Sequence, residues 1–467
     1  MSTPRTDVNG KGRPAGIAFP RMRASRLLRV RTIWTISIAA TSVLIFSITI
    51  FYIGSVVNPE GHLSGLPVAL ANEDQGATVL GRHVDIGNQV VSGLQDSSAV
   101  SSRLSLHVVS ITQAKSQMNS DDVYATVVIP PHFTSSLLAA YNLSPSSSSA
   151  GGMPTVRLLT NPRSGSIGVQ LASGVAGSAL RVASIQLGRQ LSEEASKLSR
   201  APRMGFATSS PVDVINSEFN PLPPNSALGL SAFYVALLSL MCGFLGAIFI
   251  STTVDGALGY GSSEIGPKWT QRPPVAITRW QTLLTKWIIA VVTVPMLNGI
   301  VLLVAVGILH MNAPHVAELW LFTSFGALAV AAGTLALLAV LGTFGQMIAL
   351  IVFVYLALAS SGGTIPLQAL PSALRFVANV EPMRQSVDGV RAIMYFGAAG
   401  DAGLTHGIVM TGIGLAFWVI VGLVVTMWYD HKGLERAPDE LLAYIHDSGL
   451  AYTGKTKSQD QATPNQS

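Results

Sequence analysis

The chain has 467 residues, of which 49% are hydrophobic and 11% are charged, and its mean hydropathy is +0.46. This composition is too apolar and too poor in charge for a soluble protein of this length, so it favours the membrane class. The single cysteine, Cys242, excludes a disulfide framework within one chain and a metal site built from several cysteines.

The chain begins with a basic segment. Its first 31 residues contain eight Arg or Lys and one Asp, although the net charge of the whole chain is only +5. Ahead of a hydrophobic segment, such a cluster indicates a cytoplasmic flank rather than a nucleic-acid-binding arm. We therefore expect a basic cytoplasmic N-terminus at 1–31 and no nucleic-acid partner.

Charge-free apolar runs predict six transmembrane helices, since about 20 apolar residues cross a hydrocarbon core of about 30 Å. The first covers 32–58, which is too long for a cleavable signal peptide. The other five lie within 221–430, and Gly342 and Gly345 divide a long charge-free run into two of them. An even number of spans returns 431–467 to the cytoplasm as a partly disordered tail. The sequence thus predicts a multi-pass protein among the lipids of the cell (inner or plasma) membrane, with both termini cytoplasmic.

Residues 59–220 lie between the first two spans and predict an α/β extracytoplasmic domain. Strands are expected where Val, Leu and Ile are enriched, at 67–72, 106–111, 123–130 and 154–160. A long helix is expected from about Ser166 to Leu198, because apolar residues recur there at helical spacing. The predicted fold class is an α-helical polytopic membrane protein with this α/β domain between helices 1 and 2.

Three oxygen-bearing side chains follow the first of these strands: Asn72, Glu73 and Asp74, with Gly76 close behind. They are fewer than the six to eight oxygens that calcium takes. Side chains of this type also accept hydrogen bonds from backbone N–H groups at turns and helix starts. We therefore expect a turn that defines the fold, and no metal ligand.

A predicted cytoplasmic loop at 251–285 leads into the third span. It carries or adjoins Arg272, Arg279, Trp280 and Lys286. Two interpretations are open: Trp and Arg anchor the helix at the membrane interface, or these residues form a docking surface for a soluble partner such as a separate ATPase.

The segment at 360–402 combines a break in the chain with a charged helix. The break contains Gly362, Gly363, Pro366 and Pro371. The charges Glu381, Arg384, Asp388 and Arg391 step by three, four and three residues, so they line one helical face and can pair in sequence. Pro382 suits the first turn of that helix. This pattern predicts an outer re-entrant region buried in protein.

No enzymatic motif is expected to function. The string "GLAYTGKT" at 449–456 matches a phosphate-binding loop, but polar, Pro- and Gln-containing residues follow where that loop needs a helix. The histidines of the predicted outer domain are scattered and form no H-E-x-x-H pair. No predicted span contains an internal carboxylate for a proton relay, and Asn298 is expected to bond between helices. The sequence therefore predicts no enzyme and no cofactor.

Three blocks of the sequence carry a family resemblance. They are "LPVALANEDQGA" with "VDIGNQVVSGL", then "AKSQMNSDDVYATVVIPPHF", and lastly "GQMIALIVFVYLALASSGGTIPLQALP" with "EPMRQSVDGVR". In order and placement they resemble the YhgE/Pip (phage infection protein) family, which is related to type-2 ABC exporter permeases. The chain departs from the family where a glycine is expected before Tyr124 and in lacking the long coiled-coil insertion of many members.

The resemblance implies a permease that moves a hydrophobic or amphiphilic substrate outward with energy from a separate ATPase. Such a permease would act as a homodimer or as a heterodimer with a related permease. The alternative is a non-transporting envelope scaffold, secretion accessory or phage-receptor-like protein.

Overall fold

The computed structural model describes residues 31–79, 82–143, 153–197, 210–270 and 277–434, and the single residues 272, 274, 275 and 436. The basic segment before residue 31, the loop at 144–152 and the motif at 449–456 lie outside the described residues. Contacts divide the chain into two units, 1–47 and 48–467, and each is described by itself.

The first unit is represented by helix α2 (Arg31–Ile48). The second unit begins with the π-helical turn η1 (Thr49–Ile53) and α3 (Gly54–Val56). The apolar stretch Thr41–Val56 in this region is shorter than a complete span. A first transmembrane helix at 32–58 therefore stays a prediction.

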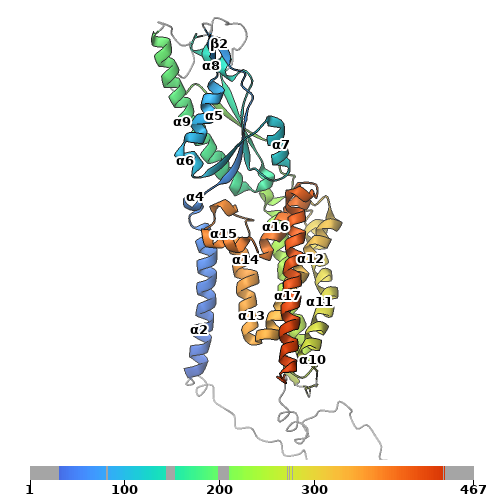
Figure 1. Ribbon diagram of the computed structural model, residues 1–467. Coiled ribbons are helices and arrows are strands. Elements are labelled where there is room, and N and C mark those ends of the chain that lie inside the picture. Colours follow the sequence, from blue (N-terminus) through green and yellow to red (C-terminus); the bar gives the residue numbers. More distant parts are fainter. Residues whose placement is uncertain are drawn as a thin grey trace, which may run out of the picture. The chain divides into compact units, whose positions relative to one another are not determined.

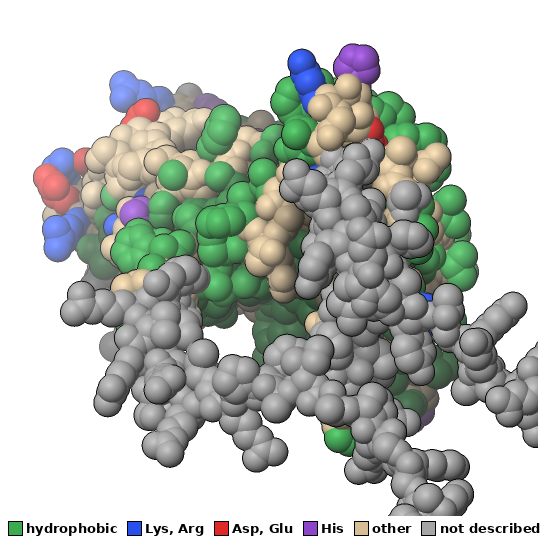
Figure 2. All heavy atoms as spheres, turned by 90° about the horizontal axis from the view of Figure 1, so that it is seen from below, with side chains coloured by type: hydrophobic (Ala, Val, Ile, Leu, Met, Phe, Trp, Pro, Cys, Tyr) green, Lys and Arg blue, Asp and Glu red, His purple; other side chains and the backbone are tan. Residues whose placement is uncertain are grey.

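Five further helical segments of the described chain are long and apolar enough to cross a membrane. They are Ser231–Ala257 (α10), Arg279–Ile308 (α11 and η4), Val316–Leu341 (α12), Thr343–Ser360 (α13, η5 and α14) and Gly400–His431 (η7 and α17). Figure 2 shows hydrophobic side chains over much of the coloured surface that is visible from below. Large apolar side chains on these helices are highly exposed, including Phe249 at 71% and Val292 at 68%. Such surfaces suit contact with lipid.

Helix α12 is the centre of the bundle. It packs against α10, α11 (Arg279–Leu302) and α17 (Thr405–His431), and most of its residues are buried. Asn298 of α11 donates to the hydroxyls of Thr323 (2.6 Å) and Ser324 (3.1 Å) on α12. The predicted interhelical bonding by Asn298 is thus confirmed.

Gly342 and Gly345 make the sharp turn between α12 and α13 (Thr343–Leu350). Gly342 has a φ of 61°, which favours glycine. A Cβ on Gly345 would lie 2.0 Å from the carbonyl oxygen of Leu337, so the two helices approach within a distance that no larger residue allows. The predicted break between two helices is confirmed.

The α/β domain, which we call the sheet domain, is built on a five-stranded sheet in the order β4-β1-β5-β6-β7. Its extracytoplasmic position stays a prediction. The strands are β1 (Leu66–Asn72), β4 (Leu104–Val108), β5 (Ala125–Ile129), β6 (Thr155–Thr160) and β7 (Asp213–Glu218). Strand β1 runs parallel to β4 and β5, with Val68 opposite Leu106 and Ala125. Strand β6 is antiparallel to β5 and parallel to β7. The mixed sheet confirms the α/β class.

Both faces of this sheet are covered by helices. Helices α5 (Ile86–Asp96) and α9 (Ser166–Lys197) lie on one side and α7 (Ile111–Asn119) on the other (Figure 1). Val68 and Leu70 belong to the first core, whereas Ala69 and Ala71 belong to the second. Strand β1 therefore alternates between two buried faces, which explains why its sequence is apolar throughout.

The predicted strands and helices are mostly confirmed, with two corrections. The strand expected at 106–111 ends at Val108, because Ser110 and Gln113 form a capping box that starts α7. Strand β7 and the hairpin of β2 (Ala77–Val79) and β3 (Arg82–Val84) were not predicted. Their short, partly polar sequences lack the apolar enrichment that identified the other strands. The long helix is confirmed as α9.

The segment between α14 (Ala357–Ser360) and α17 contains η6 (Leu367–Ala369), α15 (Ser372–Ala378), α16 (Pro382–Tyr395) and η7 (Gly400–Leu404). Ile365, Leu370 and Leu374 share one core with Leu63 and Leu66 of the sheet domain. This region therefore packs directly against the sheet domain, and its re-entrant placement stays a prediction. The predicted cytoplasmic loop contains the hairpin of β8 (Ser263–Ile265) and β9 (Lys268–Thr270).

A glycine on α10 provides a test of the bundle packing. A Cβ on Gly243 would lie 2.1 Å from the carbonyl oxygen of Ala327 on α12. We expect Gly243→Ala to lower the free energy of unfolding by about 1–3 kcal/mol, because the helices must separate. Gly414→Ala on α17, where a Cβ meets nothing within 4 Å, is the matched control. Thermal unfolding in detergent measures both, and equal losses would contradict the packing described.

Candidate functional site

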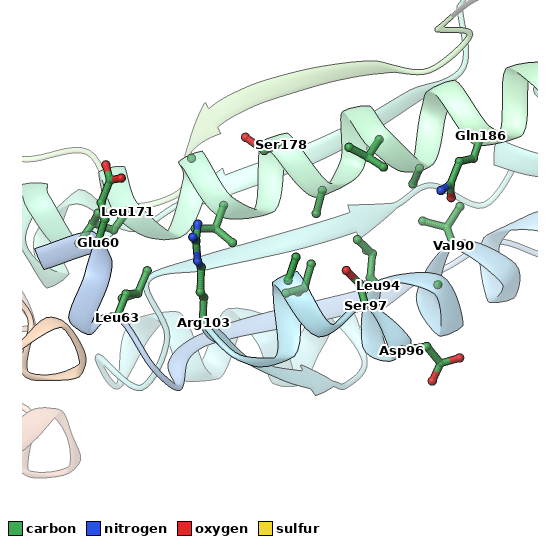
Figure 3. A pocket seen from close by; sticks show the side chains of 18 of the residues that line it. Glu60, Leu63, Val90, Leu94, Asp96, Ser97, Arg103, Leu171, Ser178 and Gln186 are labelled. Carbon is green, nitrogen blue, oxygen red and sulfur yellow. The ribbon is translucent and has the colours of Figure 1, made fainter. Parts of the chain in front are cut away.

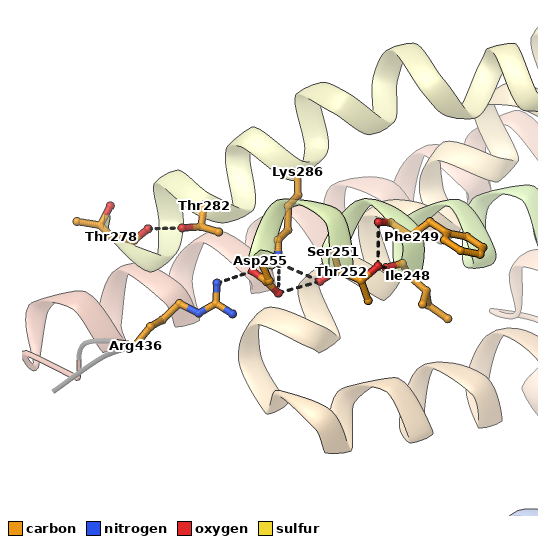
Figure 4. A network of polar contacts seen from close by, with 9 residues as sticks. All are labelled: Ile248, Phe249, Ser251, Thr252, Asp255, Thr278, Thr282, Lys286 and Arg436. Carbon is orange, nitrogen blue, oxygen red and sulfur yellow. Dashed lines mark hydrogen bonds and ion pairs between the residues drawn. The ribbon is translucent and has the colours of Figure 1, made fainter. Parts of the chain in front are cut away.

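One polar network ties together the ends of three helices of the bundle. We call it the Asp255 network, and it consists of Ser251, Asp255, Lys286 and Arg436 (Figure 4). The Lys286 ammonium lies 2.9 Å from one carboxylate oxygen of Asp255 and donates to the Ser251 hydroxyl at 2.9 Å. Arg436 lies 2.7 Å from the other oxygen of Asp255. Asp255 thus holds two cations at once.

The network compensates the charge of a buried lysine beside the end of α10. The Lys286 side chain is only 6% exposed, and a buried ammonium is costly unless it is paired and hydrogen-bonded. Asp255 supplies the counter-charge from the neighbouring helix. Asp255 was not identified as a site residue from the sequence. The signal that could have identified it is an acidic residue directly after a long charge-free run.

A second carboxylate binds the beginning of α11. Asp430, near the end of α17, accepts from the backbone N–H groups of Arg279 (3.0 Å) and Trp280 (3.1 Å). An anion at this position satisfies free N–H groups and complements the helix dipole. Arg279 also donates its Nε–H to the Leu434 carbonyl at 2.7 Å, and its guanidinium lies 5.5 Å from the centre of the Tyr429 ring. Helices α10, α11 and α17 are therefore joined by ionic contacts at one end.

The structure changes the view of the four predicted docking residues. Lys286 is buried in the Asp255 network, so it does not contribute to an exposed surface, and that part of the expectation is wrong. Arg279 is occupied by contacts with α17 and the residues after it, and Trp280 is half-buried. Arg272 is exposed. Docking of a partner at this loop stays a prediction that rests mainly on Arg272.

A double-mutant cycle measures the Asp255 network. We expect Asp255→Ala to lower the free energy of unfolding by about 3–5 kcal/mol, because it leaves the buried Lys286 ammonium without a carboxylate. Asp255→Leu combined with Lys286→Met removes both charges and should cost less than the single change. Thermal unfolding in detergent gives the values. A double variant that is as unstable as Asp255→Ala would contradict the ion-pair account.

A second charged cluster joins α16 to the sheet domain. We call it the Arg391 cluster, and it consists of Asp121, Arg384, Asp388 and Arg391. Arg384 bonds Asp388 one turn along α16 at 2.6 Å, which confirms pairing along the helix. Arg391, whose side chain is 8% exposed, instead faces Asp121 of the sheet domain at 3.7 Å. The side chain of Asp121 is 15% exposed, so this ion pair is almost buried.

The beginning of α16 follows the predicted pattern. Pro382 occupies the first turn, as expected. One carboxylate oxygen of Glu381 accepts from the N–H groups of Met383 (2.8 Å) and Arg384 (3.1 Å), so Glu381 caps the helix and does not pair with a basic side chain. Burial raises the pKa of Glu381 to about 8, although these two hydrogen bonds lower it.

The glycines and prolines before α16 shape a compact connection. Gly362 has a φ of 67°, and a Cβ on Gly363 would lie 2.3 Å from the Phe233 ring. Pro366 and Pro371 stand immediately before η6 and α15. The guanidinium of Arg375, in α15, donates to the Ser64 hydroxyl at 3.0 Å and to the Gln368 and Leu370 carbonyls at 2.9 and 3.2 Å. These bonds fasten the connection to the entrance of the sheet domain.

The turn after β1 has the predicted structural role, because its side chains form hydrogen bonds within the fold. The Asn72 side chain accepts from the Asp74 N–H at 3.1 Å, and the Glu73 N–H donates to the Ile129 carbonyl at 3.0 Å. The Asp74 carboxylate accepts from the N–H of Gly87 and from the N–H and hydroxyl of Thr134. Asp74 therefore binds the first turns of both α5 and α8 (Phe133–Ala140).

Gly76 completes this turn. Its φ is 68°, and a Cβ there would lie 2.6 Å from the His83 ring. The turn thus needs glycine at this position, while the carboxylate of Asp74 is used for hydrogen bonds within the fold.

The Arg391 cluster predicts a pH dependence of stability. Burial raises the pKa of Asp121 from 3.8 to about 6, although the Arg391 guanidinium opposes the shift. The folded chain therefore binds a proton more tightly than the unfolded chain does at this site. The free energy of unfolding should fall as the pH rises from about 4 to about 6 and should then be flat with respect to this group.

Asp121→Asn should remove this component of the pH dependence while keeping the size of the side chain. Unfolding of both proteins in detergent between pH 4 and 8 measures the difference. An unchanged pH profile in Asp121→Asn would contradict the assignment.

Comparison with known proteins agrees with the resemblance in sequence. The family described as protein of unknown function (DUF3533) matches residues 38–423. An uncharacterized protein, YhgE of Bacillus subtilis (strain 168), is 34% identical over 160 residues, which make up 33% of this chain and 20% of that relative. The chain thus covers a fifth of this relative's length. No solved structure matches the chain.

Proposed function

The chain belongs to the DUF3533 family and is a YhgE-like membrane protein, and from this premise we propose that it is the permease subunit of an export system. The system would resemble type-2 ABC transporters and would move a hydrophobic or amphiphilic substrate outward. A separate ATPase would supply the energy, and two permease copies, or one copy and a related permease, would form the path. The predicted first span would place both termini and the Asp255 network on the cytoplasmic side.

The Asp255 network is the observation that carries this proposal. A separate ATPase that drives a permease must move several of its helices together. Such coupling between a partner and the helices is carried by elements that move as rigid units. Asp255 and Asp430 fasten α10, α11 and α17 beside the loop that carries Arg272. A force applied to this loop would therefore reach three helices of the bundle at once.

The Arg391 cluster supports the same mechanism at the other end of the helix bundle. Helix α16 packs on α10, α12 and α17, and Arg391 pairs with Asp121 of the sheet domain. A change in the arrangement of the helices would thus be transmitted to the extracytoplasmic domain, where a substrate leaves the membrane.

A non-transporting envelope scaffold is the second candidate. The core that joins Leu63 and Leu66 to Ile365 and Leu374 makes the extracytoplasmic domain a firmly supported platform, and a scaffold or receptor needs that property. The two proposals differ at the loop near Arg272, which only the permease requires.

Charge reversal at Arg272 separates the two candidates. We expect Arg272→Glu to reduce co-purification of an ATPase after crosslinking in mild detergent by about tenfold, because a rim charge becomes repulsive toward an acidic partner surface. Arg82→Glu is the control, since it reverses an exposed charge on β3 of the sheet domain. Recovery of no ATPase with the unmodified protein would favour the scaffold and contradict the permease.

A further inference from the structure

A large groove lies in the extracytoplasmic domain, apart from both charged clusters. It has a volume of about 1140 Å³ and runs between α9 on one side and α4 (Pro59–His62), α5 and α6 (Ser98–Ser101) on the other (Figure 3). The wall on α9 extends from Ile167 to Gln190, which is about 35 Å of helix at about 1.5 Å per residue. The groove is longer and larger than the sites of about 300–1,000 Å³ that hold drug-sized ligands.

The walls of the groove are apolar along the middle and polar at the rim. Leu94 and Val90 project from α5 toward α9 (Figure 3). The opposite wall includes Leu171, Val175 and Val182, and the side chain of Val182 is 56% exposed. An apolar side chain that lines a groove and is still this exposed lacks a partner within the fold, and such surfaces mark binding sites.

Glycines keep the groove open. A Cβ on Gly93 or on Gly174 would meet no atom within 4 Å, and both residues line the groove. Gly177 lies on the same helix with equally open surroundings, but it does not line the groove. A side chain added at Gly93 or Gly174 would therefore enter the groove, whereas one added at Gly177 would lie outside it.

The charged lining residues Glu60 and Arg103 lie toward one end of the groove. Arg103 points toward α9, while Asp96 points away from it (Figure 3). Among the described residues, the side chains of Glu60 and Arg103 form no hydrogen bond or ion pair with each other or with any other group. This end also contains Pro59, three residues after the last residue of α3. The polar end of the groove is therefore the end nearest the predicted exit from the membrane.

We propose that this groove binds the acyl chains of a membrane phospholipid, with the lipid phosphate at Arg103. A phospholipid has the same arrangement as the groove, with a long apolar portion joined to an anionic group that a guanidinium binds in bidentate fashion. Its source is the outer leaflet, because the groove begins where the chain leaves the predicted first span. Apart from Glu60, and from Asp96, which points away from α9, the other polar lining residues are uncharged amides and hydroxyls, such as Gln186 and Ser178.

A peptide fits the groove less well. Extended peptides bind by adding a strand to a free sheet edge, and every residue that lines the groove lies on a helix or a connecting loop. A lipid chain requires no backbone hydrogen bonds, so an apolar wall of helix side chains is sufficient.

The inference rests on the proposed export function, because it names the substrate class as phospholipid or an acyl amphiphile of the same kind. Its test requires neither an ATPase nor transport. If lipid does not bind, the export proposal is still tested by recovery of the ATPase partner. If export fails, lipid binding in the groove is unaffected by that result.

Photocrosslinking tests the groove directly. The full chain is placed in nanodiscs of phosphatidylethanolamine and phosphatidylglycerol that contain a phosphatidylglycerol with a diazirine in its acyl chain. After illumination, mass spectrometry maps the adducts. We expect adducts in peptides from 86–103 and 167–190, in addition to those on the transmembrane helices.

Two variants on α9 make the test specific. Gly174→Leu fills the groove and should lower the yield of groove adducts about tenfold. Gly177→Leu makes the same change outside the groove and should leave the yield unchanged, and both variants should unfold at or above the wild-type temperature because leucine favours helix. Adducts confined to the transmembrane helices, or equal losses in the two variants, would overturn the proposal.

Discussion

Helix α16 can expose neither of its faces, and much of the structure follows from this constraint. Met383, Val387 and Val390 belong to the core of the bundle, while Arg391 on the same helix needs an anion. Asp121 of the sheet domain provides that anion, at 3.7 Å. A buried guanidinium is tolerated only with a partner, because an uncompensated buried charge costs several kcal/mol. The sheet domain is therefore held on the bundle by the charge requirement of one helix, in addition to the apolar core that the two share.

At the other end of the bundle, charges are also paired, but on different helices. Asp255 and Asp430 are placed where α10 and α17 end, and they neutralise Lys286, Arg436 and the dipole of α11. Between these two charged regions the helices pack through small residues such as Gly243 and through the bonds of Asn298. The bundle thus has ionic contacts at both ends, and its mostly apolar middle contains a few buried hydrogen-bonded polar side chains. This arrangement allows helices to move as a group while their ends keep their partners.

The sequence predicts the parts of the fold that depend on local pattern. Apolar runs identified the five described helices that are long enough to span a membrane, and the turn at Asn72 to Gly76 and the place of Pro382 in the first turn of α16 were correctly expected from residue type. The capping of α16 by Glu381 was not expected. The sequence does not predict pairings that depend on tertiary distance. Asp121 and Arg391 are far apart in the chain, and nothing near either residue indicates the other. Lys286 was expected at the surface, as an interfacial anchor or as part of a docking surface, because its partner, Asp255, comes from a different helix. The groove is equally hidden, since only the spacing between α9 and the helices opposite it leaves the groove open.

ATP-dependent movement of an acyl amphiphile is the most direct test of the permease account. The unmodified chain, purified with its crosslinked ATPase, would be reconstituted in proteoliposomes that carry a fluorescent phospholipid in the leaflet facing the ATPase. The account predicts that ATP increases the rate at which this lipid reaches the opposite leaflet, and that the Arg272→Glu protein shows no such increase. A rate that is unaffected by ATP, in vesicles where the ATPase is bound and hydrolyses ATP, would contradict it.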